Sequence, residues 1–422
     1  MNSTKQQEER VLLVAAIKKT HNEKEAIESI DELEELVETA GGYVLDKIIQ
    51  KLDHISATHY IGSGKIEELR QIIQHYEATG IVCDDELTPM QMKNLSNLLD
   101  TKVMDRTMII LDIFAKHSRS KEGNIQVEMA QLRYQYSRLT GYGEMLSRQG
   151  GGIGSKGAGE KKLELDKRHI RTRIEQLRQE LEEIQKHRNL IRSRRDKNSI
   201  PVVAIVGYTN AGKSTLLNVL TGSDVYVKDQ LFATVDPTTR AAQLPSGTEI
   251  MLTDTVGFIR KLPHHLIKAF YSTLEEAKYA DIILHVMDVS SPHLMTHQQV
   301  VYDTLEKLEI SGIPIIAVYN KIDKVNDIYP KDQRATYEVS TSAKNKINTD
   351  ALLQTIEDII YDNMLAFTVR IPYDKSELVA YCHEKGERIE QQYENEGVLI
   401  KGYMSKKDFY KIEPYSMERN GH

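Results

Sequence analysis

The sequence predicts an α/β protein in which two parallel-sheet regions are separated by a long helical hairpin and followed by a small α+β module. Three observations lead to this fold class. The chain has 422 residues, enough for roughly two to four ordinary domains. Apolar runs alternate with amphipathic stretches in residues 1–115 and 199–365, which is typical of βαβ units. In residues 116–198 the apolar spacing changes to helical steps of three and four.

Composition and cysteine use exclude several classes of protein. With 40% hydrophobic and 28% charged residues, the chain resembles an ordinary folded protein rather than a collagen or a disordered chain. Cys83 and Cys382 lie far apart, so we expect neither a disulfide framework nor a structural zinc site. The longest early apolar run, Val11–Ile17, has seven residues, well below the ~20 that span a bilayer. We therefore expect no signal peptide, no integral membrane association and a cytoplasmic location.

Residues 1–115 are predicted to form a small α/β domain with a parallel sheet. The strand-like run Val11–Ile17 is followed by an acidic amphipathic helix, Lys24–Thr39, and Ile81–Cys83 has the character of a buried strand. Gly62-Ser63-Gly64-Lys65 resembles the end of a phosphate loop, but no serine or threonine follows the lysine. We interpret it as the start of a helix that continues to about His75.

Residues 116–198 are predicted to form a basic helical hairpin. An apolar stripe from Leu163 to Ile191 recurs at heptad spacing, and a shorter stripe from Met129 to Leu139 can pair with it in the antiparallel direction. An intramolecular hairpin, and hence a monomer, is favoured over a coiled-coil dimer. Lys116–Lys197 contains 20 Lys and Arg against 11 Asp and Glu, a net +9 in a chain whose total is −7. Such a block fits either a nucleic-acid contact or a solvated helical face.

The two helices are joined by a glycine-rich loop, residues 141–159, in which eight of 19 residues are glycine. One interpretation is a flexible linker. The other is a loop tip that lies against a phosphate backbone, because glycine has no Cβ and Arg148 and Lys156 add positive charge. The residues alone do not separate these two interpretations.

Residues 199–365 carry a phosphate-binding motif in the context that its chemistry requires. The apolar strand Val202–Val206 leads into G-x-x-x-x-G-K-S, residues Gly207–Ser214, and then into a helix. Backbone N–H groups and the helix dipole can hold phosphates at such a turn. Lys213 is predicted to reach the β- and γ-phosphate oxygens, and the Ser214 hydroxyl to ligate Mg²⁺.

Further motifs follow at the ends of predicted parallel strands. Asp254 can hold Mg²⁺ through water, and the Gly257 N–H can meet the γ-phosphate. In Asn320-Lys321-Ile322-Asp323, a buried Asp323 carboxylate can accept from the N1–H and 2-amino group of guanine, donors that adenine lacks. Ser342-Ala343-Lys344 follows the next strand and can supply backbone donors for guanine O6. The combination predicts a guanine nucleotide.

In this order the motifs resemble the G domain of P-loop GTPases, and three stretches narrow the resemblance to the HflX family of ribosome-associated GTPases. Leu231–Arg240 is similar to the switch I of that family, Asp254–Phe258 to its switch II, and Gly141–Glu160 to its glycine-rich loop. The resemblance covers roughly residues 10–365. It implies a G domain with a mostly parallel sheet, preceded by a small α/β domain and an antiparallel helical hairpin and followed by an α+β module, residues 366–422.

The resemblance assigns Thr234 to the Mg²⁺ shell beside Ser214, with Thr238 and Thr239 as alternatives. Lys213, Thr234 and Gly257 are the expected catalytic positions. Phe258 occupies the position where many GTPases have a water-orienting glutamine, so we expect slow intrinsic hydrolysis. The positions expected around GTP are Gly207, Tyr208, Thr209, Asn210, Ala211, Gly212, Lys213, Ser214, Thr215, Phe232, Ala233, Thr234, Val235, Asp236, Asp254, Thr255, Val256, Gly257, Asn320, Lys321, Ile322, Asp323, Ser342, Ala343 and Lys344.

The resemblance also implies a partner and a role. Members of the family bind the large (50S) ribosomal subunit and split or rescue stalled ribosomes. We therefore expect contacts with ribosomal RNA through the hairpin, its glycine-rich loop and the N-terminal domain, and none with DNA. Two other classes stay open: an ATP-driven RNA-remodelling enzyme with a second site near Gly62–Lys65, and a GTP-gated protein adaptor that does not act on ribosomes.

Overall fold

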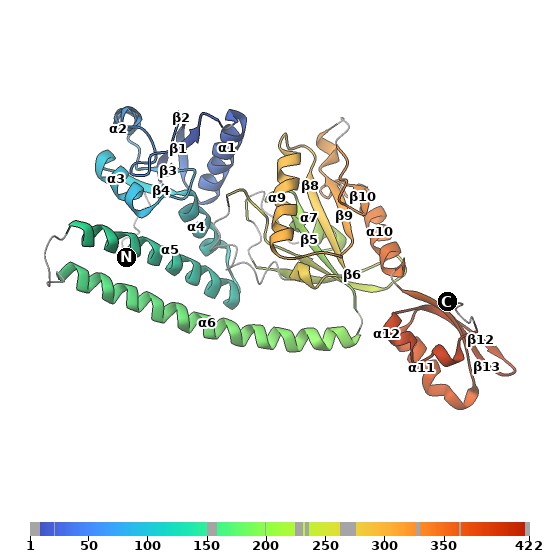
Figure 1. Ribbon diagram of the computed structural model, residues 1–422. Coiled ribbons are helices and arrows are strands. Elements are labelled where there is room, and N and C mark those ends of the chain that lie inside the picture. The colour runs from blue at the N-terminus through green and yellow to red at the C-terminus, as the bar shows by residue number, and fades with distance from the viewer. Residues whose placement is uncertain are drawn as a thin grey trace, which may run out of the picture.

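The computed structural model describes residues 9–417 apart from 21, 150–157, 199, 224–230, 233–235, 262–275, 326–329 and 363. An N-terminal α/β unit, a pair of long helices, a central sheet with its helices and a C-terminal module are arranged along an elongated molecule (Figure 1). The central sheet has six strands in the order β10-β9-β8-β5-β7-β6. The predicted α/β fold class is confirmed. None of the described helices combines the length and apolarity needed to cross a bilayer.

The N-terminal unit contains a parallel four-stranded sheet in the order β2-β1-β3-β4. β1 is apolar on both sides because helices cover both faces of the sheet: Leu13 packs with α1 and α4, and Leu12 packs with α2 and α3. Gly62 is the N-cap of α2, as expected of a helix start. The elements are β1 Arg10–Lys18, α1 Glu23–Thr39, β2 Tyr43–Leu52, α2 Ser63–Tyr76, β3 Gly80–Cys83, α3 Pro89–Leu99, β4 Lys102–Asp105 and α4 Arg106–His117.

Two long helices follow, α5 (Lys121–Gln149) and α6 (Ala158–Asn198). They lie side by side, and α6 extends from beneath the N-terminal unit to beneath the central sheet (Figure 1). Ile125 and Met129 of α5 are buried against Leu177 of α6. The residues packed around this cluster are Leu132, Ile174, Leu181 and Ile184. Part of the heptad stripe of α6 is therefore buried within the chain itself.

The central sheet is parallel except for β6, which pairs antiparallel with β7. Its elements are β5 Val202–Gly207, α7 Lys213–Leu220, β6 Thr238–Gln243, β7 Glu249–Asp254, β8 Ile282–Asp288, α9 Leu294–Lys307, β9 Ile315–Asn320, η1 Ile322–Lys324, β10 Tyr337–Ser340 and α10 Thr349–Asp362. The edge strand β6 was not predicted. It places Thr238 opposite Asp254, and Thr239 Oγ1 lies 3.0 Å from Thr253 Oγ1.

The C-terminal module has an antiparallel sheet in the order β11-β13-β12. Its elements are β11 Leu365–Ile371, η2 Tyr373–Lys375, α11 Ser376–Lys385, β12 Glu387–Glu394, β13 Gly397–Met404, α12 Lys406–Phe409 and η3 Glu413–Tyr415. It contacts α10 through Arg388, whose Nη2 lies 3.0 Å from Glu357 Oε2 and whose guanidinium lies over the Tyr361 ring. Because Glu357 is 1% exposed, this ion pair is shielded from solvent on the α10 side.

Candidate functional site

The candidate site lies at the carboxyl edge of the central sheet, where β5 ends. From Gly207 the chain turns through a short loop into the N-terminus of α7. Two residues of this loop have left-handed backbone angles, with φ of +60° at Asn210 and +95° at Gly212. A Cβ on Gly212 would lie 2.3 Å from Asn320 Nδ2, so the position requires glycine. The loop and the first turn of α7 thus provide the backbone arrangement that binds phosphate.

Lys213 is buried within this loop. Its side chain is 6% exposed, and Nζ donates to the Tyr208 carbonyl at 2.8 Å. A Cβ on Gly257 would lie 2.9 Å from Nζ, so the ammonium group lies next to Gly257 of switch II. Burial lowers the pKa of Lys213 to about 8, Asp254 raises it and Lys321 lowers it further. A bound phosphate would favour the charged ammonium and raise this pKa again.

Two oxygen ligands suited to Mg²⁺ lie side by side. Ser214 Oγ donates to Asp254 Oδ2 at 2.7 Å, and Asp254, the last residue of β7, is 1% exposed. Mg²⁺ is usually held by one or two such hard oxygen donors together with substrate phosphates, so the pair fits this ion. The described part of the chain has no cluster of three His, Cys, Asp or Glu side chains that would form a separate metal site. Thr234 lies outside the described residues, as do Ala233 and Val235.

The end of β9 joins the phosphate loop to the loop after β10. Asn320 Nδ2 donates to the Ala211 carbonyl at 2.9 Å, and Asn320 Oδ1 accepts from the Ala343 N–H at 3.0 Å. Lys321 Nζ donates to the Asn210 carbonyl at 2.8 Å. The motifs that were separate in the sequence are thus connected by direct hydrogen bonds, as a single nucleotide site requires.

Asp323 follows in η1, where its Oδ1 accepts from Ser342 Oγ at 2.5 Å. This donation lowers the pKa of Asp323, so the carboxylate is ionised at neutral pH. The expectation that Asp323 is buried is wrong, because η1 turns the side chain to the protein surface and leaves it exposed. An exposed, ionised carboxylate beside the Ser342 loop remains accessible to the N–H groups of a base. Ile322 precedes it in η1, and the positive charge of Lys344 also lowers the pKa of Asp323.

Phe258 anchors switch II to the phosphate loop. Its N–H donates to the Gly207 carbonyl at 3.1 Å, and its carbonyl accepts from the Thr209 N–H at 2.8 Å. The ring is 2% exposed and belongs to a core that includes Phe232 and Ile259. Phe258 therefore packs in the core of the protein. Of the neighbouring switch II positions, Thr255 Oγ1 donates to the Ile205 carbonyl, and Val256 is buried in the same core as Phe258.

Two described residues of switch I, Phe232 and Asp236, contact the helical region, while Thr238–Arg240 belong to β6. The Phe232 ring packs edge-on against Phe114 of α4, with centroids 4.6 Å apart. Asp236 Oδ2 accepts from the N–H groups of Arg119 and Ser120 at 2.7 Å each, and Oδ1 accepts from Ser120 Oγ at 2.5 Å. The Asp236 carboxylate thus caps the chain entering α5. No local sequence signal could show this, because Asp236 and Ser120 are 116 positions apart.

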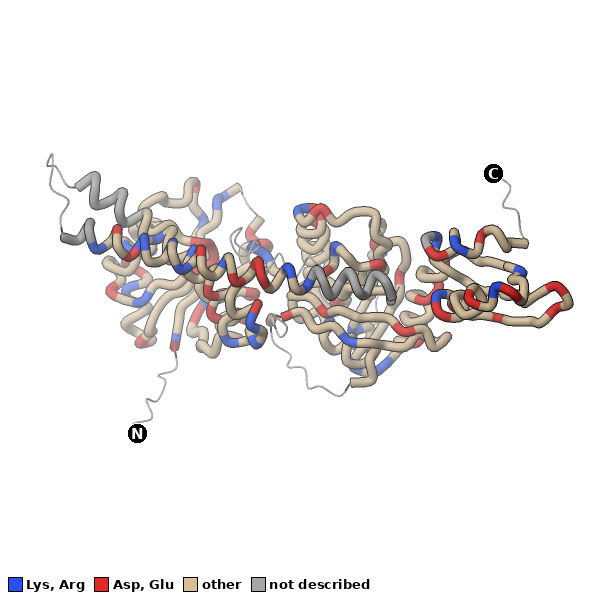
Figure 2. Tube along the Cα trace, turned by 90° about the horizontal axis from the view of Figure 1, so that it is seen from below, with Lys and Arg blue, Asp and Glu red and all other residues tan. Residues whose placement is uncertain are grey.

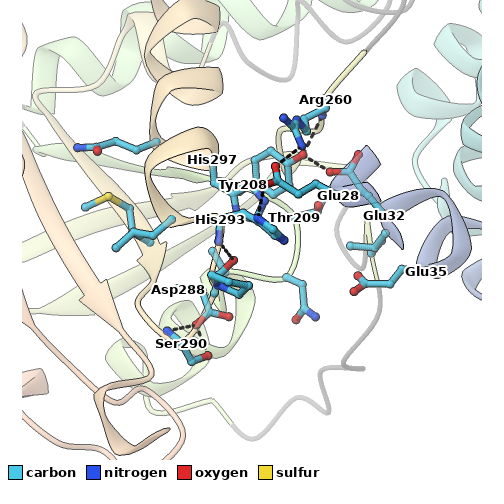
Figure 3. A pocket seen from close by; sticks show the side chains of 18 of the residues that line it. Glu28, Glu32, Glu35, Tyr208, Thr209, Arg260, Asp288, Ser290, His293 and His297 are labelled. Carbon is cyan, nitrogen blue, oxygen red and sulfur yellow. Dashed lines mark hydrogen bonds and ion pairs between the residues drawn. The ribbon is translucent and has the colours of Figure 1, made fainter. Parts of the chain in front are cut away.

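A cavity of about 390 Å³ lies between α1, the phosphate loop and the start of α9. On its wall the Tyr208 ring stacks on His297 with centroids 3.7 Å apart, and the Tyr208 hydroxyl accepts from the Arg260 N–H at 2.9 Å (Figure 3). Glu28 of α1 pairs with Arg260 at 2.9 Å and with His293 at 2.9 Å. Glu32 of α1 accepts from the Tyr208 hydroxyl, so the N-terminal unit contacts both the phosphate loop and Arg260, which follows switch II.

Three family models match consecutive parts of the chain. The family described as GTP-binding GTPase N-terminal matches residues 27–115, and the GTP-binding GTPase Middle Region matches residues 117–195. The family described as 50S ribosome-binding GTPase matches residues 202–321. Among solved structures, a GTP-binding protein from Sulfolobus solfataricus in complex with GDP is 27% identical, with a TM-score of 0.43, 82% of this chain covered and 98% of that chain.

Curated relatives match over almost the whole length. A GTPase HflX of Lacrimispora saccharolytica is 51% identical over 401 residues, which cover 95% of this chain and 94% of the relative. A GTPase HflX of Caldanaerobacter subterraneus is also 51% identical over 401 residues, which cover 95% of this chain and 92% of the relative. Together with the hydrogen-bonded phosphate loop, Ser214–Asp254 pair and N-K-x-D motif at one sheet edge, this similarity shows that the chain belongs to the HflX family of GTPases.

Proposed function

We propose that this protein hydrolyses GTP on the large ribosomal subunit and uses nucleotide-dependent ordering of its switches to split or rescue stalled ribosomes in the cytoplasm. The observation that carries the proposal is the connection of the phosphate loop to the guanine motif through Asn320 and Lys321. In this proposal residues 1–115, 116–198, 199–365 and 366–422 act as an N-terminal domain, a hairpin, a G domain and a C-terminal module.

The proposed chemistry assigns a role to each group at the site. Lys213 and the loop N–H groups hold the β- and γ-phosphates, and the Gly257 N–H meets the γ-phosphate. Mg²⁺, when bound to Ser214, Thr234 and, through water, Asp254, neutralises charge on the phosphates. Since Phe258 is buried and apolar, another group must orient the attacking water. Basal turnover should therefore be slow and should rise when a partner orders the switches.

The hairpin is the proposed RNA-binding element. α6 has 41 residues and is therefore about 60 Å long, enough to reach far from the G domain. Between Lys162 and Arg178 it has six Lys and Arg against three Asp and Glu. Exposed basic positions alternate with acidic ones along the helices (Figure 2). Arg173 pairs with Glu128 of α5 at 2.7 Å, which leaves Lys162 and Arg168, both exposed, as better candidates for phosphate contact.

GTP turnover by the purified protein, alone and with increasing 50S subunits or 70S ribosomes, tests the proposal, with ATP in parallel. We expect slow basal GTP turnover that rises steeply with 50S subunits. Light scattering of 70S ribosomes mixed with the protein and a non-hydrolysable GTP analogue should report subunit separation. Turnover that ignores ribosomes would favour the GTP-gated adaptor, and ATP turnover above GTP turnover would contradict the role of Asp323.

A matched pair of surface variants tests the hairpin. Changing Lys162 and Arg168 to Gln should weaken 50S binding and reduce its salt dependence, because each phosphate contact contributes to the salt slope. The control changes the exposed neighbours Glu164 and Asp166 to Gln and Asn, which should leave binding unchanged or strengthen it. Equal effects of the two variants would remove the electrostatic argument for RNA contact.

A further inference from the structure

Asp288, the last residue of β8, lies outside every motif that the sequence singles out, yet it contacts the guanine motif directly. β8 and β9 are parallel neighbours, and Asp288 stands opposite Asn320 in their register. Asp288 Oδ2 lies 2.7 Å from Lys321 Nζ, with side chains 18% and 19% exposed respectively. Charged hydrogen bonds of this length in a mostly buried setting are the stronger kind.

The Asp288 carboxylate is itself held in one orientation. Its Oδ1 accepts from the Ser290 N–H at 2.9 Å and from Ser290 Oγ at 2.6 Å, contacts that are visible in the close view of the cavity (Figure 3). An aspartate that accepts from the residue two positions ahead forms a local turn of its own. The contacts with Ser290 therefore fix the orientation of Asp288 Oδ2, the oxygen that faces Lys321, independently of Lys321.

Lys321 in turn contacts the phosphate loop. Its backbone is left-handed, with φ of +66°, and its Nζ donates to the Asn210 carbonyl at 2.8 Å. Asn210 also has a left-handed backbone, with φ of +60°, which costs free energy in a residue other than glycine. The ammonium of Lys321 thus connects the fixed carboxylate of Asp288 to the carbonyl of Asn210, a loop residue with an unfavourable backbone conformation.

We propose that Asp288 is a positioning residue for nucleotide binding: it holds Lys321 on the Asn210 carbonyl and so keeps the phosphate loop in its binding conformation. The proposal rests on the proposed nucleotide site. Asp288 acts through Lys321 and has no role in bond breaking. Its loss should therefore weaken GDP and GTP equally and leave kcat at saturating GTP nearly unchanged.

The test is a double-mutant cycle with Asp288→Asn and Lys321→Ala, read as the Kd for fluorescent GDP and GTP analogues. Asp288→Asn keeps the shape of the side chain and removes its charge. It should raise Kd about tenfold for both nucleotides, the size expected for loss of a charged hydrogen bond. In the Lys321→Ala background the same change should alter Kd less than about twofold, because its partner is already missing. Asp53→Asn, which breaks the exposed Lys19–Asp53 pair, is the matched control.

Several outcomes would overturn the proposal: an unchanged Kd in Asp288→Asn, an equal effect with and without Lys321, or a fall in kcat with constant KM. If Asp288→Asn fails to fold, Ser290→Ala replaces it, since it keeps the carboxylate but releases one of its contacts. This variant should raise Kd about two- to threefold, again only when Lys321 is present. The Kd for GDP is measured without ribosomes. If ribosomes failed to stimulate GTP turnover, the proposed function would be refuted, but the double-mutant cycle would still test the role of Asp288.

Discussion

Asn320→Ala is the most informative single change at the nucleotide site. Asn320 is 2% exposed, and its amide connects the Ala211 carbonyl to the Ala343 N–H. Both of these residues are 1% exposed, so the change leaves two buried backbone groups without their partner. Each such loss costs about 1–3 kcal/mol, and entry of water brings the sum to about 3 kcal/mol. The phosphate loop and the loop after β10 then move independently until a nucleotide joins them.

The expected result is a Kd for GDP that rises about 10- to 100-fold, because most of the ~3 kcal/mol is then drawn from the binding free energy. Fluorescent GDP titration at 25 °C measures it, with thermal unfolding as a check that the variant is folded. Asn218→Ala on α7, which breaks a 2.9 Å contact with Arg240, is the control for loss of a helical asparagine. A Kd within twofold of the unmodified protein would refute the reasoning.

A second variant separates the two hydrogen bonds. Asn320→Asp keeps the acceptor for the Ala343 N–H but places an oxygen against the Ala211 carbonyl, so it should bind GDP no better than Asn320→Ala. Gly212→Ala would place its Cβ 2.3 Å from Asn320 Nδ2. Combining Gly212→Ala with Asn320→Ala should relieve the clash but not the strain of φ +95° at residue 212. The double variant should therefore recover part of the GDP binding that Gly212→Ala alone loses.

Individual side chains give four further predictions. Lys213→Ala should abolish nucleotide binding. In the unmodified protein, burial lowers the pKa of Lys213 to about 8, against 10.5 for a solvated lysine, so GTP binding above pH 8 should take up a proton and weaken as pH rises. Calorimetry in two buffers of different ionisation heat would show this proton uptake. Asp323→Asn should weaken GTP and favour xanthosine triphosphate in competition titrations, because the carboxylate acceptor for the base is lost. Gly123→Ala would place a Cβ 2.1 Å from Asp236 Oδ1, so it should lower the unfolding temperature, and an unchanged value would contradict the capping contact. Phe258→Gln buries an amide in an apolar core and should destabilise the fold by about 1–3 kcal/mol. It should not raise basal GTP turnover. A large gain in turnover would show that the missing glutamine amide alone limits hydrolysis.

The sequence predicts the parts of the fold whose signal is local. β5 and β8 are apolar runs because the parallel sheet is covered on both faces. Gly212 is predicted as a loop glycine, and the structure supplies the reason in the space taken by Asn320. The start of α2 at Gly62 is equally local, since a helix needs only its own first turn and a suitable cap.

Other features depend on contacts between distant parts of the chain. β6 is polar and short because it is an edge strand with one paired side, so it lacks the apolar run that reveals a buried strand. The exposure of Asp323 depends on how η1 turns after β9, which the N-K-x-D pattern does not encode. Asp288 and Asp236 contact residues that only the fold brings near, Lys321 and Ser120, and a single acidic residue carries no pattern of its own.

Buried contacts of the two switches connect the candidate nucleotide site to the base of the hairpin. Phe232 of switch I and Phe258 of switch II belong to the same buried core as Phe114 of α4 and Val127 of α5. Burial of a phenylalanine contributes about 2–3 kcal/mol, and an N-terminal capping carboxylate such as Asp236 contributes about 1 kcal/mol. The free energies of these contacts together equal or exceed the roughly 1–3 kcal/mol that couples two sites in typical allosteric proteins. Under the proposed function, a rearrangement of the switches on nucleotide exchange would repack the base of α5, and α6 would move with it because part of its apolar stripe is buried on α5.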